Sequence, residues 1–168
     1  MERQLYDNMR TIERKHWWFV ARRSILSDQI SRLSIGPEAR ILEVGCGTGG
    51  NIPMLQAFGD VVGVEPDDLS RDYAQSATGS QVFSGLLPAG LPAFEAHFDL
   101  IAALDVLEHV DADAASVVAL ADLLKPGGKM LTTVPAHPWM WSRHDVAHHH
   151  KRRYRKADYE DLFHAAKL

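Results

Sequence analysis

Short apolar runs alternate with longer amphipathic segments along most of this 168-residue chain. Continuous apolar runs are typical of parallel strands, because helices cover both faces of a parallel sheet. The runs predict strands at residues 40–44, 61–64, 81–83, 100–104 and 130–134. Helical spacing and composition predict helices at residues 16–33, 51–58, 69–76, 112–124 and 157–166. Strands that alternate with helices in this way favour an α/β fold with a doubly wound, mostly parallel sheet.

Glycine and proline residues predict where several of these elements end. Gly36-Pro37 is expected to end the first helix, and Pro126-Gly127-Gly128 to stop the helix over residues 112–124. Pro53 is expected to open a helix from its first turn, and Gly59 to close it. The glycines and prolines of residues 84–93 predict a loop.

The turn after the strand at residues 40–44 is rich in glycine, with Gly45, Gly47, Gly49 and Gly50 within six positions. Glycine accepts positive φ and has no Cβ, so the backbone of such a turn can approach a ligand closely. A strand, a glycine-rich turn and a helix together predict a nucleotide-binding loop. Gly45, Gly47 and Gly50 fit the pattern G-x-G-x-x-G, with Glu65 at about the interval of a ribose-binding acid, which leaves a nicotinamide dinucleotide as one interpretation.

Glu43 adds a second interpretation, because Glu43-x-Gly45-x-Gly47-x-Gly49 resembles motif I of the class I S-adenosylmethionine-dependent methyltransferases. Residues 61–66, 98–110 and 123–131 resemble that family's later motifs, in the same order along the chain. The resemblance implies a Rossmann-like methyltransferase fold and S-adenosylmethionine as the cofactor.

The resemblance also implies a set of cofactor-binding residues. Glu43 would help to organise the methionine part, Glu65 would accept hydrogen bonds from the ribose, and Leu104 would face the cofactor or acceptor. Many relatives bind the adenine amino group with an acid after the third strand, whereas this chain has Ser84-Gly85-Leu86-Leu87, whose backbone or serine is expected to substitute. The complete set is Glu43, Gly45, Cys46, Gly47, Thr48, Gly49, Glu65, Pro66, Leu86, Leu104 and Asp105. Within it, Cys46 is interpreted as a small packing residue, since no charge-stabilised thiolate environment is visible in the sequence.

Two further segments point to the acceptor side. The HWWFVARR run at residues 16–23 and the PAH…D…HxRRY pattern at residues 135–154 resemble a bacterial subset of these methyltransferases. That resemblance implies a small-molecule acceptor or one linked to a lipid or glycan. Because the loop after the fifth strand lies over the acceptor pocket in this fold, the candidate bases or acceptor ligands are His137, Asp145 and His150.

Other residues of the acceptor side have two interpretations each. Trp139, Trp141 and Tyr154 either form apolar walls of the pocket or pack their own loop. His109 either acts as a general base or hydrogen-bonds its loop and borders the pocket.

Histidines and arginines near the C-terminus raise the questions of metal and anion binding. His144, His148, His149 and His150 cannot easily share one face of an element and have no cysteine beside them, so the sequence predicts no metal site. Arg152-Arg153 could bind an anionic group, or could lie at an exposed helix start. A basic run of six residues in a chain of net charge −4 does not predict nucleic-acid binding.

Charge is distributed unevenly, at +3 for residues 1–40, −12 for residues 41–124 and +5 for residues 125–168. Negative potential in the middle segment would favour the sulfonium and ammonium groups of S-adenosylmethionine, or simply reflects solvated helix surfaces. Cys46 is the single cysteine, the first residues lack the layout of a signal peptide, and no apolar run approaches the length of a membrane span. We therefore expect no integral membrane segment and a cytoplasmic protein, while the sequence leaves the oligomeric state open.

The expected organisation is a single domain over residues 1–168. Residues 1–36 form a helical cap, residues 38–135 the cofactor-binding core, and residues 136–168 an acceptor-side loop and helix. The family resemblance implies two further antiparallel strands, so the chain is expected to be truncated or part of a longer one. The leading hypothesis is methyl transfer, and the alternatives are a catalytically idle S-adenosylmethionine-binding module and an NAD-dependent oxidoreductase.

Overall fold

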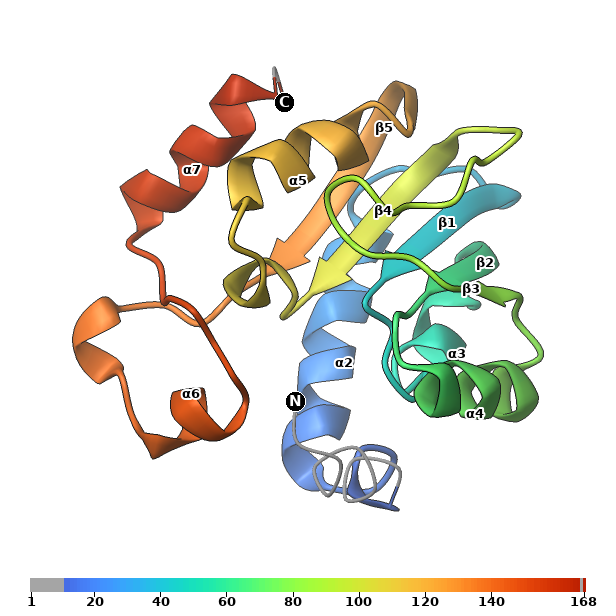
Figure 1. Cartoon of the computed structure of the whole chain (residues 1–168). Helices are drawn as coiled ribbons and strands as arrows, with labels where there is room; N and C mark the ends of the chain where they lie inside the picture. The colour runs from blue at the N-terminus through green and yellow to red at the C-terminus, as the bar shows by residue number, and fades with distance from the viewer. Residues whose placement is uncertain (1–10, 167) are drawn as a thin grey trace.

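A twisted parallel sheet forms the centre of the computed structural model, which describes residues 11–166 and 168 (Figure 1). The order of its strands is β3-β2-β1-β4-β5, and every neighbouring pair is parallel. The strands are β1 (Ala39–Val44), β2 (Gly59–Val64), β3 (Val82–Phe83), β4 (Phe98–Leu104) and β5 (Leu124–Thr133). The predicted α/β class and parallel sheet are therefore confirmed.

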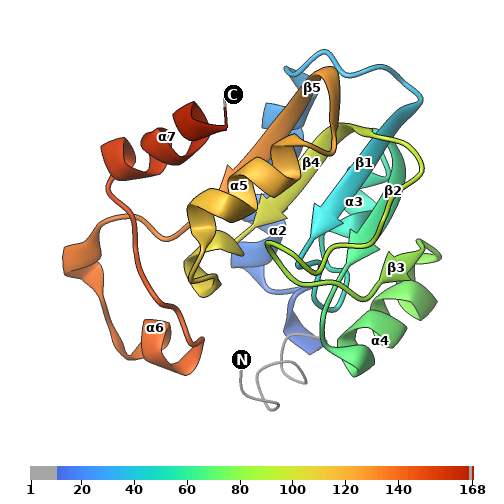
Figure 2. The same cartoon turned by 45° about the horizontal axis from the view of Figure 1, so that its top comes forward.

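Helices cover both faces of the sheet (Figures 1 and 2). The α-helices are α2 (Trp17–Ser31), α3 (Ile52–Leu55), α4 (Asp68–Thr78), α5 (Asp113–Ala121), α6 (Arg143–Ala147) and α7 (Lys156–Ala165). Two 3₁₀ helices, η1 (Leu107–His109) and η2 (Pro138–Met140), follow β4 and β5. No helix in the described part of the chain combines the length and apolar character of a membrane span.

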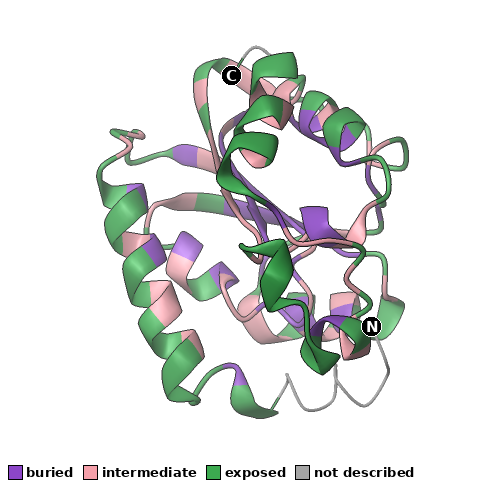
Figure 3. Cartoon of the chain, turned by 90° about the vertical axis from the view of Figure 1, so that its left-hand side faces the viewer, coloured by how far each residue is buried: buried purple, intermediate pink, exposed green. Residues whose placement is uncertain are grey.

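Alternate residues of β1 point into two separate hydrophobic clusters. Ile41 packs in a cluster with Ile30 of α2 and Ile52 of α3, whereas Leu42 packs in a cluster with Leu120 of α5. The buried residues accordingly concentrate in the strands and on the inward faces of the helices (Figure 3). Period-two alternation of side chains thus produces two cores, one on each face of the sheet.

The strand order changes direction between β1 and β4, which are neighbours in the sheet although β2 and β3 lie between them in sequence. Val44 at the end of β1 lies beside Ala103 of β4. Ligands of open α/β sheets bind outside the carboxyl ends of the strands at such a switch point. The fold therefore directs attention to the loops after β1 and β4.

Two predicted boundaries were wrong, and both involve close backbone packing. Gly59 begins β2 rather than closing a helix. Glycine is needed there because a Cβ would lie 2.0 Å from the carbonyl oxygen of Ala39 in β1. The preceding helix α3 is accordingly shorter than predicted. Residues 126–128 lie within β5 as an irregularity, since Phe98 pairs with Leu124 while Leu100 pairs with Lys129.

Candidate functional site

The glycine-rich loop after β1 holds its backbone in the left-handed region, with φ of 68° at Gly45, 54° at Gly47 and 80° at Gly49. A Cβ at Gly47 would meet no atom within 4 Å, and this residue borders both of the cavities described below. A Cβ at Gly45 would lie 2.7 Å from Cγ2 of Val106. Glycine is therefore required at these positions for the backbone conformation, and the missing side chain of Gly47 also keeps the cavity open.

Glu65 follows β2 and is 3% exposed. One of its carboxylate oxygens accepts a hydrogen bond from the backbone N–H of Gly47 at 2.9 Å, and the other from that of Asp67 at 3.0 Å. Burial raises the pKa of Glu65 despite these two donors. The carboxylate is thus rigidly placed, and its remaining lone pairs suit the two hydroxyls of a ribose.

A cavity of about 250 Å³ lies beside Glu65. Its walls include Pro66, Gly85, Leu86 and Val110. Ser84 is not among its lining residues, so of the predicted replacements for the missing adenine-binding acid, Gly85 and Leu86 are the ones beside the cavity.

Glu43 lies at the end of β1 and is 1% exposed. Oε1 accepts a hydrogen bond from Nδ2 of Asn51 at 3.0 Å, whereas Oε2 has no partner among the described residues. Burial raises the pKa of Glu43 to about 7, and the nearby charges of Glu13 and Glu65 add to the shift. A buried, unpaired carboxylate oxygen of this kind favours a cationic ligand group nearby.

Glu13 is a second buried acid at the loop, and sequence reasoning did not identify it. Its Oε1 accepts a hydrogen bond from Oγ1 of Thr48 at 2.7 Å, and its side chain lies 5% exposed. A Cβ at Gly50 would lie 2.5 Å from Oε2 of Glu13, so this glycine makes room for the acid. No local motif marks Glu13, because it reaches the loop from residues before α2.

The remaining loop residues have packing roles as well as positions near the cofactor pocket. Cys46 is buried, and burial raises the pKa of its thiol. Cys46 also lines the larger cavity, and its burial fits the packing interpretation. Gly49 packs against Ala74 and Thr78 of α4 and does not line either cavity.

A larger cavity of about 480 Å³ adjoins the first. It is enclosed by α2, the glycine-rich loop, the end of β4, η1 and part of the segment after β5. The residues common to the two cavities are Gly45, Gly47, Asp105 and His109. Both cavities therefore open onto the switch point of the sheet.

Asp105 connects this switch point to the N-terminal helix. Its Oδ2 lies 2.8 Å from the guanidinium of Arg22, and its Oδ1 accepts a hydrogen bond from Oγ1 of Thr133 at 2.8 Å. Arg22 also donates to Oγ1 of Thr133 at 2.6 Å. The HWWFVARR segment thus reaches the site through Arg22, Trp18 and Phe19, all of which line the larger cavity.

Two residues of η1 face the larger cavity. Glu108 is fully buried, and neither of its carboxylate oxygens has a partner among the described residues. Burial, with a contribution from Asp105, raises the pKa of Glu108 to about 8. Burial lowers the pKa of His109 to about 4, so its imidazole is neutral at pH 7.

The three predicted catalytic candidates occupy different positions. His150 lines the larger cavity, and its Nδ1 lies 2.9 Å from Oδ1 of Asp145. Asp145 is fully buried and does not line either cavity. His137 is exposed and lies outside both linings, and its backbone N–H donates to the carbonyl oxygen of Tyr154. The structure therefore brings only His150 of the three to a cavity wall.

Asp145 instead organises the segment around it. It receives hydrogen bonds from Nε and from NH2 of Arg153 at 2.7 and 2.9 Å, and it completes a capping box with Ser142 at the start of α6. The hydrogen bonds from Arg153 hold the pKa of Asp145 well below its usual range. This carboxylate is a permanent anion that orients His150.

The other acceptor-side residues are placed as follows. Trp139 and Trp141 are 81% and 44% exposed and do not line either cavity. The hydroxyl of Tyr154 is buried and donates to the carbonyl oxygen of Leu107 and to Asp113, so this residue packs the segment onto η1 and α5. The packing interpretation therefore holds for Tyr154, whereas the two exposed tryptophans fit neither the packing interpretation nor that of pocket walls.

The two arginines considered for anion binding both pair with carboxylates of the chain. Arg152 donates to Asp113 at 2.7 Å and to the carbonyl oxygen of Asp111, and Arg153 pairs with Asp145. An external anion would have to compete with these pairs. Lys156, at the start of α7, lies 3.6 Å from Glu160, as expected of an exposed helix start.

A parallel sheet with a glycine-rich loop and buried acids at its switch point is typical of nucleotide-binding α/β enzymes. Comparison with known families agrees, because a family described as a methyltransferase domain matches residues 18–168. The chain belongs to this family, the class I S-adenosylmethionine-dependent methyltransferases. That assignment excludes the NAD-dependent oxidoreductase.

Curated relatives include several enzymes named ubiquinone biosynthesis O-methyltransferase. The one from Xylella fastidiosa (strain 9a5c) is 36% identical over 114 residues, which cover 63% of this chain and 46% of the relative. The one from Cereibacter sphaeroides (strain ATCC 17025) is 34% identical over 98 residues, covering 55% and 39%. The chain thus spans less than half of the length of these relatives.

Solved structures of low sequence identity share the fold. An S-adenosylmethionine-bound amino pentose methyltransferase from Micromonospora echinaspora superposes with a TM-score of 0.67 at 22% identity, over 84% of this chain and 61% of that one. A sugar N-methyltransferase from Streptoalloteichus sp. gives a TM-score of 0.68 at 22% identity, over 84% and 57%.

Proposed function

We propose that this domain transfers the methyl group of S-adenosylmethionine to a small-molecule acceptor bound in the larger cavity. The observation that carries the proposal is the junction of the two cavities at Gly45, Gly47, Asp105 and His109. A donor whose adenosine part lies in the smaller cavity and an acceptor in the larger cavity would meet there. Methyl transfer is an in-line displacement, so holding the two reactants in this geometry supplies much of the catalysis.

The adenosine part of the cofactor would occupy the smaller cavity, and its methionine part would extend along the glycine-rich loop into the larger cavity. Glu65 would accept hydrogen bonds from the ribose hydroxyls, and Leu86 would pack against the adenine. The ammonium group would lie near the unpaired oxygen of Glu43, beside Asn51 in the larger cavity. When bound, S-adenosylmethionine supplies a methyl group that its sulfonium already activates.

The acceptor cavity combines apolar walls with a few polar groups, as is typical of small-molecule sites. Trp18, Phe19 and Val134 form apolar parts of the wall, and Asp105 and His150 are polar groups beside it. Its volume of about 480 Å³ fits one compact ring system, so an acceptor linked to a lipid or glycan would place only its reacting end inside. We propose a hydroxyl oxygen as the methylated atom, which the O-methyltransferase names of the relatives support.

Two measurements on the purified chain test this function. Calorimetric titration with S-adenosylhomocysteine is expected to give saturable binding, and the same titration with NAD is expected to give none. Incubation with methyl-labelled S-adenosylmethionine and fractionated cell extract is expected to label an acceptor. Cofactor binding without any labelled product would contradict methyl transfer and favour the idle binding module.

A further inference from the structure

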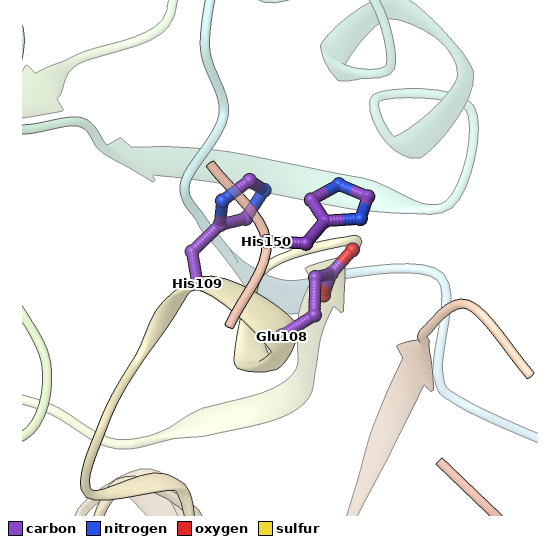
Figure 4. Close-up of side chains that lie close together, drawn as sticks. All are labelled: Glu108, His109 and His150. Carbon is purple, nitrogen blue, oxygen red and sulfur yellow. The ribbon is translucent and has the colours of Figure 1, made fainter. Parts of the chain in front are cut away.

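The larger cavity contains a cluster that the cofactor does not use, formed by Glu108, His109 and His150 (Figure 4). One potential ligand atom from each side chain lies within 4.8 Å of those of the other two. The rings of His109 and His150 meet edge to face, with their centroids 4.8 Å apart. Two neighbouring residues of η1 thus converge with a third residue that is about forty positions away in the sequence.

Glu108 lacks the partners that a buried carboxylate normally has. It is fully buried, and both of its oxygens are without a hydrogen bond from any described residue. Leaving a buried carboxylate unpaired costs free energy, so a cation placed against it would stabilise the site. The observation points to a ligand with positive charge.

Both histidines have one ring nitrogen already occupied by the protein. Nδ1 of His150 lies 2.9 Å from Oδ1 of Asp145 and donates to it, so Nε2 presents a lone pair. A hydrogen bond with the backbone of His149 holds the ring of His109. Histidine ligands of metals typically donate their second nitrogen to a carboxylate or a carbonyl in this manner.

The backbone holds the cluster together at several points. The N–H of Lys151 donates to the carbonyl oxygen of Glu108 at 2.8 Å, and the N–H of His150 to that of Asp145 at 2.9 Å. The hydroxyl of Tyr154 also binds the carbonyl oxygen of Leu107. These bonds fix the segment that carries His150 against η1.

We propose that Glu108, His109 and His150 bind a divalent transition-metal ion, with Asp145 orienting His150 from behind. Two imidazoles and a carboxylate suit Zn²⁺, Co²⁺, Mn²⁺ or Fe²⁺, and three protein ligands leave a coordination position open. Ligands at ~2.1 Å from a tetrahedral metal are ~3.4 Å apart, so the side chains would move together by ~1 Å on binding.

This proposal differs from the sequence analysis, in which the histidine run predicts no metal site. Only His150 of that run belongs to the cluster, and the other ligands come from η1.

The metal's role in methyl transfer rests on the proposed function. All three ligands line the acceptor cavity, so the open position faces the acceptor. An acceptor hydroxyl bound there would release its proton to water, because a metal lowers the pKa of a bound hydroxyl. The oxygen then forms the new bond to the methyl carbon as the bond from carbon to sulfur breaks. The electron pair of that bond remains on sulfur, which gives S-adenosylhomocysteine and a methyl ether.

The site is tested by titrating the EDTA-dialysed full chain with Co²⁺, followed by visible absorption and calorimetry. We expect one Co²⁺ per chain and competition by Zn²⁺. Glu108→Gln and His150→Ala are each expected to weaken binding at least tenfold. Glu108→Gln keeps the size and shape of a buried carboxyl group that has no partner among the described residues, so this variant is expected to fold. Normal affinity in both variants would overturn the proposal.

Two control variants separate this cluster from adventitious histidine binding. His164→Ala changes an exposed histidine of α7 and is expected to keep the affinity of the parent chain. His144, whose ring centroid lies 6.0 Å from that of His150, is the sharper control. If His144→Ala removes Co²⁺ binding as fully as Glu108→Gln does, histidines outside the cluster hold the metal and the proposal fails.

Binding of S-adenosylhomocysteine, measured in the same variants, tests the proposed function separately and is expected to be unchanged.

Discussion

The cofactor side and the acceptor side of this site are built in different ways. The cofactor side uses Glu43, the glycine loop and Glu65, which lie within 23 consecutive residues at the carboxyl ends of two adjacent strands. The acceptor side joins Arg22, Glu108 and His150 from distant parts of the chain. A contiguous backbone loop leaves a local sequence signature, whereas a cluster assembled by tertiary packing leaves little.

The two sides also differ in how their acids are stabilised. Glu43 and Glu65 are buried near one another, and burial raises the pKa of both. Asp145 is just as buried, but Arg153 and the backbone N–H of Ser142 hold it ionised. The cofactor side thus keeps acids that a cationic ligand group can pair with. On the acceptor side, Asp145 is already paired, and only Glu108 is left without a partner among the described residues.

The largest expected effect is on the cofactor side, in Gly47→Val. A branched side chain at φ of 54° strains the backbone and enters the cofactor cavity, so S-adenosylhomocysteine binding is expected to be lost in calorimetric titration. Gly79→Val is the matched control, because Gly79 has φ of 74° and open space around it but caps α4 away from both cavities. The control is expected to lose stability and keep its affinity. Equal loss of affinity in both variants would mean that strain, rather than the cavity, is responsible.

On the acceptor side, His150→Ala is expected to lower the turnover number by about 10² to 10⁴, because it removes a group that assists deprotonation of the acceptor. Affinity for S-adenosylhomocysteine is expected to be unchanged. His137→Ala, which alters an exposed histidine outside both cavities, is expected to stay within a few-fold of the parent. A larger loss of turnover in His137→Ala than in His150→Ala, measured in a steady-state methyl-transfer assay, would contradict this assignment.

Glu65→Ala is expected to weaken S-adenosylhomocysteine binding by about 10- to 150-fold. This range corresponds to the loss of charged hydrogen bonds worth about 1.5–3 kcal/mol. Asp68→Ala, which removes an exposed acid at the start of α4, serves as the control and is expected to bind normally. A folded Glu65→Ala protein with unchanged affinity would remove Glu65 from the ribose site.

The smallest effect concerns pH and Glu43. With a pKa of about 7 in the folded chain, Glu43 is protonated at pH 6 and ionised at pH 8. Binding of an ammonium group favours the ionised form, so affinity for S-adenosylhomocysteine is expected to rise about tenfold between these pH values. Glu43→Gln keeps the hydrogen bond from Asn51 and is expected to remove this dependence. A dependence that persists in the variant would assign it to another group.

The same shift has the opposite consequence for the stability of the ligand-free chain. Because the folded state disfavours the ionised form of Glu43, its contribution to stability falls as pH rises from the unfolded value of about 4.5 to about 7. Free energies of unfolding, measured by denaturant titration at several pH values within this window, are expected to fall with pH more steeply for the parent than for Glu43→Gln. The same dependence of stability on pH in both proteins would show that folding does not shift the pKa of this carboxyl group.

Much of the fold could be predicted from the sequence, since its strands are continuous apolar runs and its helices have clear ends. The errors at Gly59 and at residues 126–128 arose because the close approach of two backbones has no local signal distinct from a turn. On the acceptor side, His150 was identified, but the roles of Glu108 and Asp145 were not. Glu108 faces the cavity and Asp145 faces Arg153 because of the packing between η1 and residues 142–153. No local sequence pattern predicts that packing.

An experimental structure of the chain with S-adenosylhomocysteine tests the central claim most directly. We expect the ribose hydroxyls on Glu65, the adenine against Leu86, and the sulfur at the junction between Gly47 and Asp105. The sulfur would then face the larger cavity and His150. An adenosine moiety in the larger cavity, or a sulfur directed away from it, would contradict the assignment of donor and acceptor to the two cavities.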